Sequence, residues 1–134
     1  MKTILITAIG GDIGQAVASV IRDSLPHIRL IGVDMNTRHG GELFVDVFRQ
    51  IPAADDADYL ASLSSLVEEF NVDALIPNSE YELAAFPAVG DALGGCPVIH
   101  CGRRMLEVGL DKLKTARLLT NMELNAPWTT PVDS

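Results

Sequence analysis

The residues best suited to bind an anion are glycines near the N-terminus. The loop Gly10-Gly11-Asp12-Ile13-Gly14 follows an apolar run, Ile4 to Ile9, and precedes a segment of helical spacing. Glycines between a strand and a helix let the backbone approach an anion at the helix N-terminus. Asp34, at the end of the second apolar run, has the position of the ribose-binding carboxylate in dinucleotide-binding folds.

An NAD(P)-binding Rossmann-type oxidoreductase or epimerase fragment is therefore one interpretation, although its pattern is incomplete. Ile9 or Ala8, depending on the register, replaces the glycine that makes the tight turn. Neither tyrosine has a lysine four residues later, so the sequence assigns no catalytic residue. The remaining glycines equally suit a tight turn without a ligand, with Asp12 as a helix cap.

Cysteine and histidine supply no further chemistry. Cys96 and Cys101 bracket an apolar run of strand length, which separates their α-carbons too far for a disulfide. Both are predicted to be buried, reduced thiols. The three histidines are scattered without the spacing of metal ligands, so no metal site is predicted.

Apolar runs of strand length alternate with segments of helical spacing, which is typical of βαβ units. The strands are predicted at Ile4–Ile9, Leu30–Val33, Ala74–Ile76 and Val98–Ile99, with a weaker one at Leu43–Val47. The helical segments run from Ile13 to Ile21, Tyr59 to Phe70 and Phe86 to Leu93. We predict a Rossmann-like α/β fold, an open, doubly wound, mostly parallel sheet of about five strands with helices on both faces. Ligands of such sheets bind beyond the carboxyl ends of the strands, here the loops starting at Gly10, Asp34, Asn78 and Gly102.

Composition narrows the classes of partner. The 134 residues, 48% of them hydrophobic, are enough for one well-buried core. A formal net charge of −8 would repel nucleic acid and anionic membranes. The first apolar run is too short for an export signal or a membrane span, so a cytoplasmic protein is expected.

The pattern changes from Leu110 onward. Asp111 suits the N-cap of a helix over Lys112 to Asn121, and an extended segment starts at Ala126. We predict an α/β domain over residues 1–109, followed over 110–134 by a linker helix and the start of a truncated second domain. Earlier in the chain, Ser79 and Glu82 have the spacing of a capping box.

Two stretches resemble the N-terminal, pre-ATP-grasp domain of ATP-grasp ligases. The first is Asn71 to Leu83, and the second runs from the Asp111-Lys112 helix to Ala126-Pro127-Trp128-Thr129. The similarity is to the carbamoyl-phosphate-synthase-like branch, and the second stretch is also similar to D-alanine ligases and biotin carboxylases. The resemblance spans nearly the whole chain.

The resemblance implies the substrate-side domain of an ATP-dependent ligase that phosphorylates a carboxylate and lets an amine or similar nucleophile displace the phosphate. ATP and Mg²⁺ would be bound mainly by the protein's own C-terminal ATP-grasp domain, so activity is not expected from this chain alone. Lys112 would reach the nucleotide phosphates, and Gly10, Gly11 and Glu80 would border the acceptor substrate. A homodimer is compatible with the resemblance, and a non-catalytic binding domain is the remaining alternative.

Local physics adds support for the role of Lys112. A cation in the first turn of a helix is disfavoured by about 0.3–1 kcal/mol because it faces the positive end of the helix dipole. Lys112 and Lys114 both have this position, which favours an anion nearby.

Overall fold

A computed structural model describes residues 1–86 and 90–132. The chain divides into two compact units, Met1–His100 and Cys101–Ser134, and each is described by itself. The domain limits 1–109 and 110–134 stay predictions.

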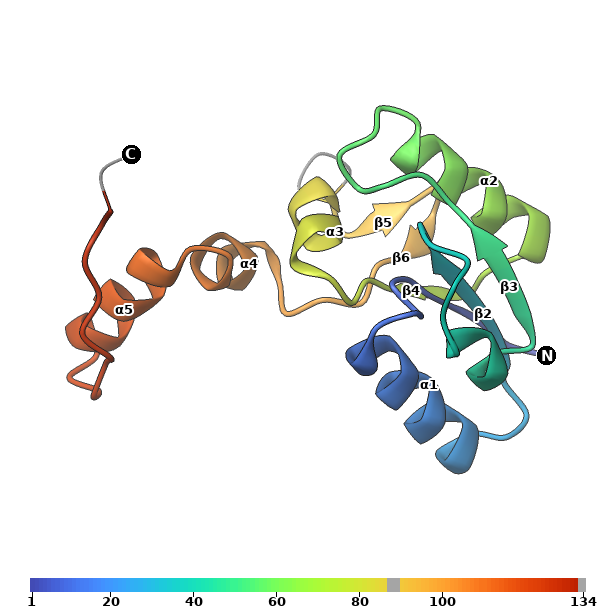
Figure 1. The fold of residues 1–134 in the computed structure, drawn as a ribbon, viewed down its shortest axis with the longest axis horizontal. Coiled ribbons are helices and arrows are strands. Elements are labelled where there is room, and N and C mark those ends of the chain that lie inside the picture. The colour runs from blue at the N-terminus through green and yellow to red at the C-terminus, as the bar shows by residue number, and fades with distance from the viewer. Residues whose placement is uncertain (87–89, 133–134) are drawn as a thin grey trace. The chain divides into compact units, whose positions relative to one another are not determined.

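The first unit is built on a parallel sheet of four strands in the order β3-β2-β1-β4 (Figure 1). The strands are β1 (Thr3–Ile6), β2 (Arg29–Asp34), β3 (Val47–Gln50) and β4 (Ala74–Ile76). In the centre of the sheet, Leu5 lies opposite Ile31 on one side and Leu75 on the other. Val98 adds a single parallel bridge to Leu75 where a fifth strand was predicted. The predicted fold class is confirmed.

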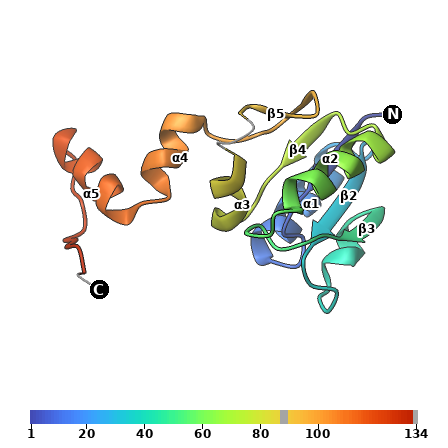
Figure 2. The ribbon, with the colours of Figure 1, turned by 90° about the horizontal axis from the view of Figure 1, so that it is seen from above.

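Helices cover both faces of this sheet because apolar side chains project from each face. Helix α1 (Asp12–Ser24) lies on one side of the sheet and α2 (Tyr59–Phe70) on the other (Figures 1 and 2). Ala18 of α1 packs in a cluster with Ile6, Ile9 and Leu30. The cluster on the other face is larger and contains Leu5, Ile31, Val33, Ile51, Tyr59, Leu63, Val67, Val72, Leu75, Phe86, Leu93, Cys96 and Val98.

Two predicted elements differ from the structure. Of the run Leu43–Val47, only Val47 is in a strand: a 3-10 turn, η1 (Gly41–Phe44), precedes β3, which starts at Val47. The segment predicted to be helical, Phe86 to Leu93, ends instead in a short strand, β5 (Ala92–Leu93), which pairs antiparallel with β6 (Cys96–Pro97). Val89 of that prediction lies outside the described residues. A short helix, α3 (Glu80–Ala85), precedes it.

The cysteines differ in their surroundings, although both were predicted to be buried. Cys96 is buried and Cys101 is exposed, and both are free thiols. Burial raises the pKa of the Cys96 thiol. The prediction of a buried thiol is therefore wrong for Cys101, which lies beyond the last bridge of the sheet, at Val98.

The second unit contains two helices, α4 (Arg103–Gly109) and α5 (Lys112–Asn121), followed by an extended segment. The predicted helix over Lys112 to Asn121 is confirmed with these bounds. In the part of the chain that the structure describes, no helix has the length and apolar character needed to cross a membrane.

Candidate functional site

The glycine loop links β1 to α1 through a strained turn. Ala8 has a positive φ of 48°, a left-handed conformation that favours glycine. This residue occupies one of the positions where the dinucleotide-binding patterns have glycine, so the tight turn forms here at a conformational cost. The N–H of Gly11 then donates to the carbonyl of Ala8 at 3.1 Å, and Gly11 is the N-cap of α1. Backbone strain in a loop of this kind is characteristic of binding sites.

Glycine is required at position 10 by the groups packed against it. A Cβ there would lie 2.6 Å from Cδ2 of His39 and 2.9 Å from Oδ2 of Asp34. The same carboxylate oxygen accepts the N–H of Gly10 at 2.9 Å, and the other oxygen of Asp34 accepts the N–H of Asn36 at 2.9 Å. Asp34 thus joins the loops that follow β1 and β2, which accounts for its position without a ribose ligand.

A second polar group joins β1 to the loop after β4. The hydroxyl of Thr7 donates to Oε2 of Glu82 at 2.6 Å, and this oxygen also accepts the N–H of Ser79 at 3.2 Å. The Ser79 hydroxyl accepts the N–H of Glu82, which completes the predicted capping box. Glu82 is only 7% exposed, so these hydrogen bonds compensate a carboxylate that is almost removed from water. Capping is one of two roles for this residue, because Glu82 also binds the end of β1.

Tyr59 lies beside this carboxylate. The side chain is 1% exposed, and its hydroxyl lies close enough to the Glu82 carboxylate to interact with it. Burial raises the pKa of Tyr59, and the nearby charge of Glu82 raises it further. The phenol therefore stays protonated and offers a donor on the side of Glu82.

These loops border one cavity of about 1010 Å³ at the carboxyl edge of the sheet. Its walls come from the segments after all four parallel strands, which is where ligands of open α/β sheets bind. The lining residues are Ala8, Gly10, Gly11, Asp34, Met35, Asn36, Thr37, Arg38, His39, Gln50, Ile51, Pro52, Ala53, Ala54, Asp55, Ser79, Tyr81 and Glu82.

His39 contributes a polar edge to this wall. Its Nδ1 accepts the N–H of Gly41 at 3.1 Å, which places the ring proton on Nε2. The ring meets Phe48 edge-on at 5.0 Å between centroids. Nε2 is buried without a hydrogen-bond partner among the described residues.

The structure separates the predicted site residues into three groups. Gly10 and Gly11 line the cavity, as the glycine pattern indicated. Glu80 is exposed at the first residue of α3, between the lining residues Ser79 and Tyr81, and is not itself a lining residue. Lys112 belongs to the other compact unit.

Sequence reasoning missed Glu82, His39 and Asp55 as lining residues. A signal for Glu82 was available in Thr7, the one hydroxyl within the apolar run Ile4–Ile9. Such a hydroxyl needs a polar partner when it is buried. No comparable signal marks His39 or Asp55.

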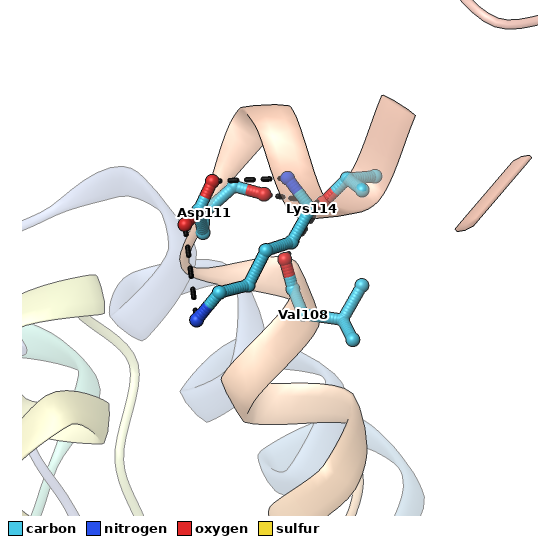
Figure 3. A network of polar contacts seen from close by, with 4 residues as sticks. Val108, Asp111 and Lys114 are labelled. Carbon is cyan, nitrogen blue, oxygen red and sulfur yellow. Dashed lines mark hydrogen bonds and ion pairs between the residues drawn. The ribbon is translucent and has the colours of Figure 1, made fainter. Parts of the chain in front are cut away.

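Lys112 is the first residue of α5, whose start is held by its own polar contacts (Figure 3). The side chain of Asp111 accepts the N–H of Lys114 at 3.0 Å, and the Lys114 ammonium lies 3.8 Å from the same carboxylate. The hydroxyl of Thr115 donates to the carbonyl of Val108 at 2.8 Å and so joins α5 to α4. Asp111 is the predicted N-cap, and this prediction is confirmed.

The cavity wall does not suit a resident divalent metal ion or a nucleotide triphosphate. The described residues contain no group of three or more His, Cys, Asp or Glu side chains placed to hold a metal. Arg38 is the one Lys or Arg side chain on the cavity wall, against three carboxylates. Phosphate sites need several donors or cations, so the cavity does not fit the phosphates of ATP.

Comparison with solved structures shows the fold. N5-carboxyaminoimidazole synthetase from Staphylococcus aureus, solved with ADP, matches over 90% of this chain with a TM-score of 0.65 and 16% identity. Glycinamide-RNase-transformylase T from Mycobacterium tuberculosis matches over 91% with a TM-score of 0.64 and 15% identity. The biotin carboxylase domain of thermophilic 2-oxoglutarate carboxylase, bound to ADP, matches over 90% with a TM-score of 0.60 and 15% identity.

The chain spans 30%, 35% and 27% of these three proteins. No family model and no curated protein sequence matches it. The chain therefore has the fold of the pre-ATP-grasp N-terminal domain, as the resemblance predicted.

Proposed function

We propose that this chain is the N-terminal, substrate-side domain of an ATP-dependent carboxylate ligase that acts through an acyl-phosphate intermediate. The observation that carries the proposal is the cavity built by the loops after four parallel strands, in a fold shared with synthetases and carboxylases. Two of those proteins were solved with ADP, which supports the use of ATP.

The cavity is proposed to hold the acceptor substrate. Gly10 and Gly11 would bring backbone close to it, and Glu82 would present its carboxylate from the segment after β4. Glu80, next to the lining residues at the start of α3, is proposed to face the acceptor at the mouth. ATP and Mg²⁺ would be bound mainly by the C-terminal ATP-grasp domain of the full-length protein. This is consistent with a cavity wall that has too few cations for a triphosphate.

Lys112 is proposed to reach the nucleotide phosphates. It stands in the first turn of α5, where the helix dipole disfavours a cation unless an anion compensates it. Near phosphates, its ammonium would orient the nucleotide and offset the charge that develops during phosphoryl transfer. A soluble cytoplasmic ligase, with a homodimer as one assembly, completes the proposal.

The test is the Lys112→Ala variant of the full-length protein. A charge-assisted hydrogen bond to phosphate contributes about 1.5–3 kcal/mol, so we expect the KM for ATP to rise about tenfold or more. Lys114→Ala is the matched control, because it removes the same charge from the same turn of α5. Steady-state kinetics at varied ATP measures both. An unchanged KM and turnover in Lys112→Ala would exclude the proposed role.

A further inference from the structure

The carboxylate of Glu82 is a buried point of contact between three elements around the cavity. Thr7, directly after β1, donates its hydroxyl proton to Oε2 at 2.6 Å. The N–H of Ser79, the N-cap of α3, donates to the same oxygen at 3.2 Å. Tyr59, the first residue of α2, lies close enough to interact with this carboxylate. Glu82 lines the cavity although it is only 7% exposed, so one side chain connects the cavity to all three elements.

The hydroxyl of Thr7 can direct its proton only toward Glu82. Its oxygen accepts the N–H of Asn78 at 3.2 Å, and the side-chain amide of Asn78 donates to the carbonyl of Thr7 at 3.1 Å. A hydroxyl has a single proton, so Thr7 is an acceptor toward Asn78 and a donor toward Glu82. The sequence of hydrogen bonds from Asn78 through Thr7 to Glu82 therefore has a fixed direction.

Tyr59 supplies a second donor from another element. Its ring belongs to the larger apolar cluster and is 1% exposed, so close packing keeps the phenol beside Glu82. Burial raises the pKa of Tyr59, and the charge of Glu82 raises it further, so the hydroxyl keeps its proton. Thr7 and Tyr59 thus hold the same carboxylate from β1 and from α2.

Helix capping does not account for these two contacts. The bonds between Ser79 and Glu82 already complete the capping box, which needs no group from β1 or α2. Thr7 and Tyr59 are not among the lining residues in the part of the chain that the structure describes, so they would act on a ligand through Glu82. Donors added to a carboxylate that is already capped restrict its orientation, and a binding site needs its contact groups held in one orientation.

We infer that Thr7 and Tyr59 are positioning residues of the proposed ligase, which hold the carboxylate of Glu82 in the orientation that contacts the acceptor substrate. This inference rests on the proposed function and assigns to it two residues that do not touch the substrate. A displaced carboxylate weakens acceptor binding, while the ATP site in the C-terminal region is unaffected.

The first experiment measures ADP release by the full-length protein with ATP, Mg²⁺ and a defined mixture of bicarbonate, small carboxylic acids and amino acids. The component that stimulates most is then titrated. Thr7→Val replaces the hydroxyl by a methyl group of similar size, and we expect the KM for this component to rise about tenfold with the KM for ATP unchanged. Thr7→Ser keeps the hydroxyl and should restore the wild-type KM. Thr3→Val is the matched control, because Thr3 is also buried but lies at the other end of β1 from the cavity.

Three outcomes would contradict the positioning role of Thr7. They are an unchanged acceptor KM in Thr7→Val, an equal rise in the KM for ATP, and a failure of Thr7→Ser to restore binding. Each of them leaves the ligase function standing. An absence of ATP turnover by the wild-type protein with the whole mixture overturns both the proposed function and the inference.

The second experiment uses Tyr59→Phe, which removes the hydroxyl and leaves the ring in the apolar cluster. We expect the acceptor KM to rise about threefold or more, again with the KM for ATP unchanged. Circular dichroism confirms that each variant is folded, and Tyr59→Phe carries the test if Thr7→Val does not fold. A folded Tyr59→Phe with the wild-type acceptor KM would overturn the role of Tyr59.

Discussion

The two units of the chain, residues 1–100 and the described residues 101–132, are each stabilised by a different kind of interaction. The first unit has buried apolar clusters on both faces of its sheet. Among the described residues of the second unit, Leu106 is the buried apolar side chain, and α5 has no buried residue. Local hydrogen bonds replace the core there, namely the Asp111 cap and the bond from Thr115 to Val108. Burial of many side chains stabilises far more than a few exposed hydrogen bonds.

The difference matters for the two proposed functional regions, one in each unit. The cavity borders the carboxyl ends of β1 and β2, which carry fully buried side chains, so this part of its wall is fixed by the core. Lys112 is the first residue of α5, and the cap before it is a local contact. A rigid cavity and a lysine on a locally stabilised helix are therefore expected in one chain.

The largest expected effect is a difference in stability between two variants, each of which truncates one leucine side chain in one of the two units. Leu63→Ala removes a fully buried side chain from the larger cluster and is expected to lower the free energy of unfolding by about 3 kcal/mol. Leu118→Ala removes a half-buried side chain of α5 and should cost about 1 kcal/mol or less. Urea unfolding followed by circular dichroism measures both. Equal costs would mean that α5 is buried in the protein to the same extent as α2.

A smaller effect is expected at the glycine loop. In Gly14→Ala, the added Cβ would lie 2.5 Å from the carbonyl oxygen of Ala8 and 3.0 Å from Cα of Ile9. Both are backbone atoms that cannot turn away, so we expect a loss of about 1–3 kcal/mol despite the better helix propensity of alanine. Gly40→Ala is the control, because a Cβ there meets open space. Thermal unfolding of the two variants provides the measurement, and a fully stable Gly14→Ala would show that this loop can shift.

The parts of the fold that sequence predicts best are strands whose residues are all apolar. Ala74–Ile76 was predicted with the bounds that the structure has, because its apolar run is bounded by Asp73 and Pro77. Strand β3 was misplaced because half of it is polar: Arg49 and Gln50 are exposed. The apolar residues before it, Phe44 and Val45, instead pack against the cluster on the α1 face.

The candidate site was only partly predictable for a related reason. Glycine is the residue type that lets the backbone approach a ligand closely, so Gly10 and Gly11 could be predicted from the sequence as site residues, and both line the cavity. Glu82 was explained by its cap to Ser79, three residues away, whereas its bond to Thr7 joins residues 75 apart. Because the local capping pattern already accounted for Glu82, the sequence offered no reason to expect its second contact, which only the tertiary fold forms.

The smallest effect concerns acid, and we compare one carboxylate of lowered pKa from each unit. The Lys2 ammonium and the N–H of Thr3 hold the pKa of Asp73 below its usual value of 3.8. The N–H of Lys114 and the positive charges of Lys114 and Arg117 do the same for Asp111. A carboxyl group whose pKa is lower in the folded state stabilises that state above its unfolded pKa. This contribution is lost as the pH falls below 3.8 through the folded value.

Acid should therefore loosen α5 before it affects the core. Protonated Asp111 no longer accepts strongly from Lys114, so amide exchange at Lys114 and Thr115 should rise several-fold, relative to an unstructured reference, as the pH falls from 5 to 3. Leu5, fully buried in the sheet, should keep its protection over this range because Asp73 braces only the strand ends. Asp111→Asn keeps a capping oxygen without a titrating group, and its exchange should be independent of pH in this respect. If Leu5 lost protection together with α5, the two units would unfold as one, and the contrast between a core-stabilised cavity and a cap-stabilised lysine would be wrong.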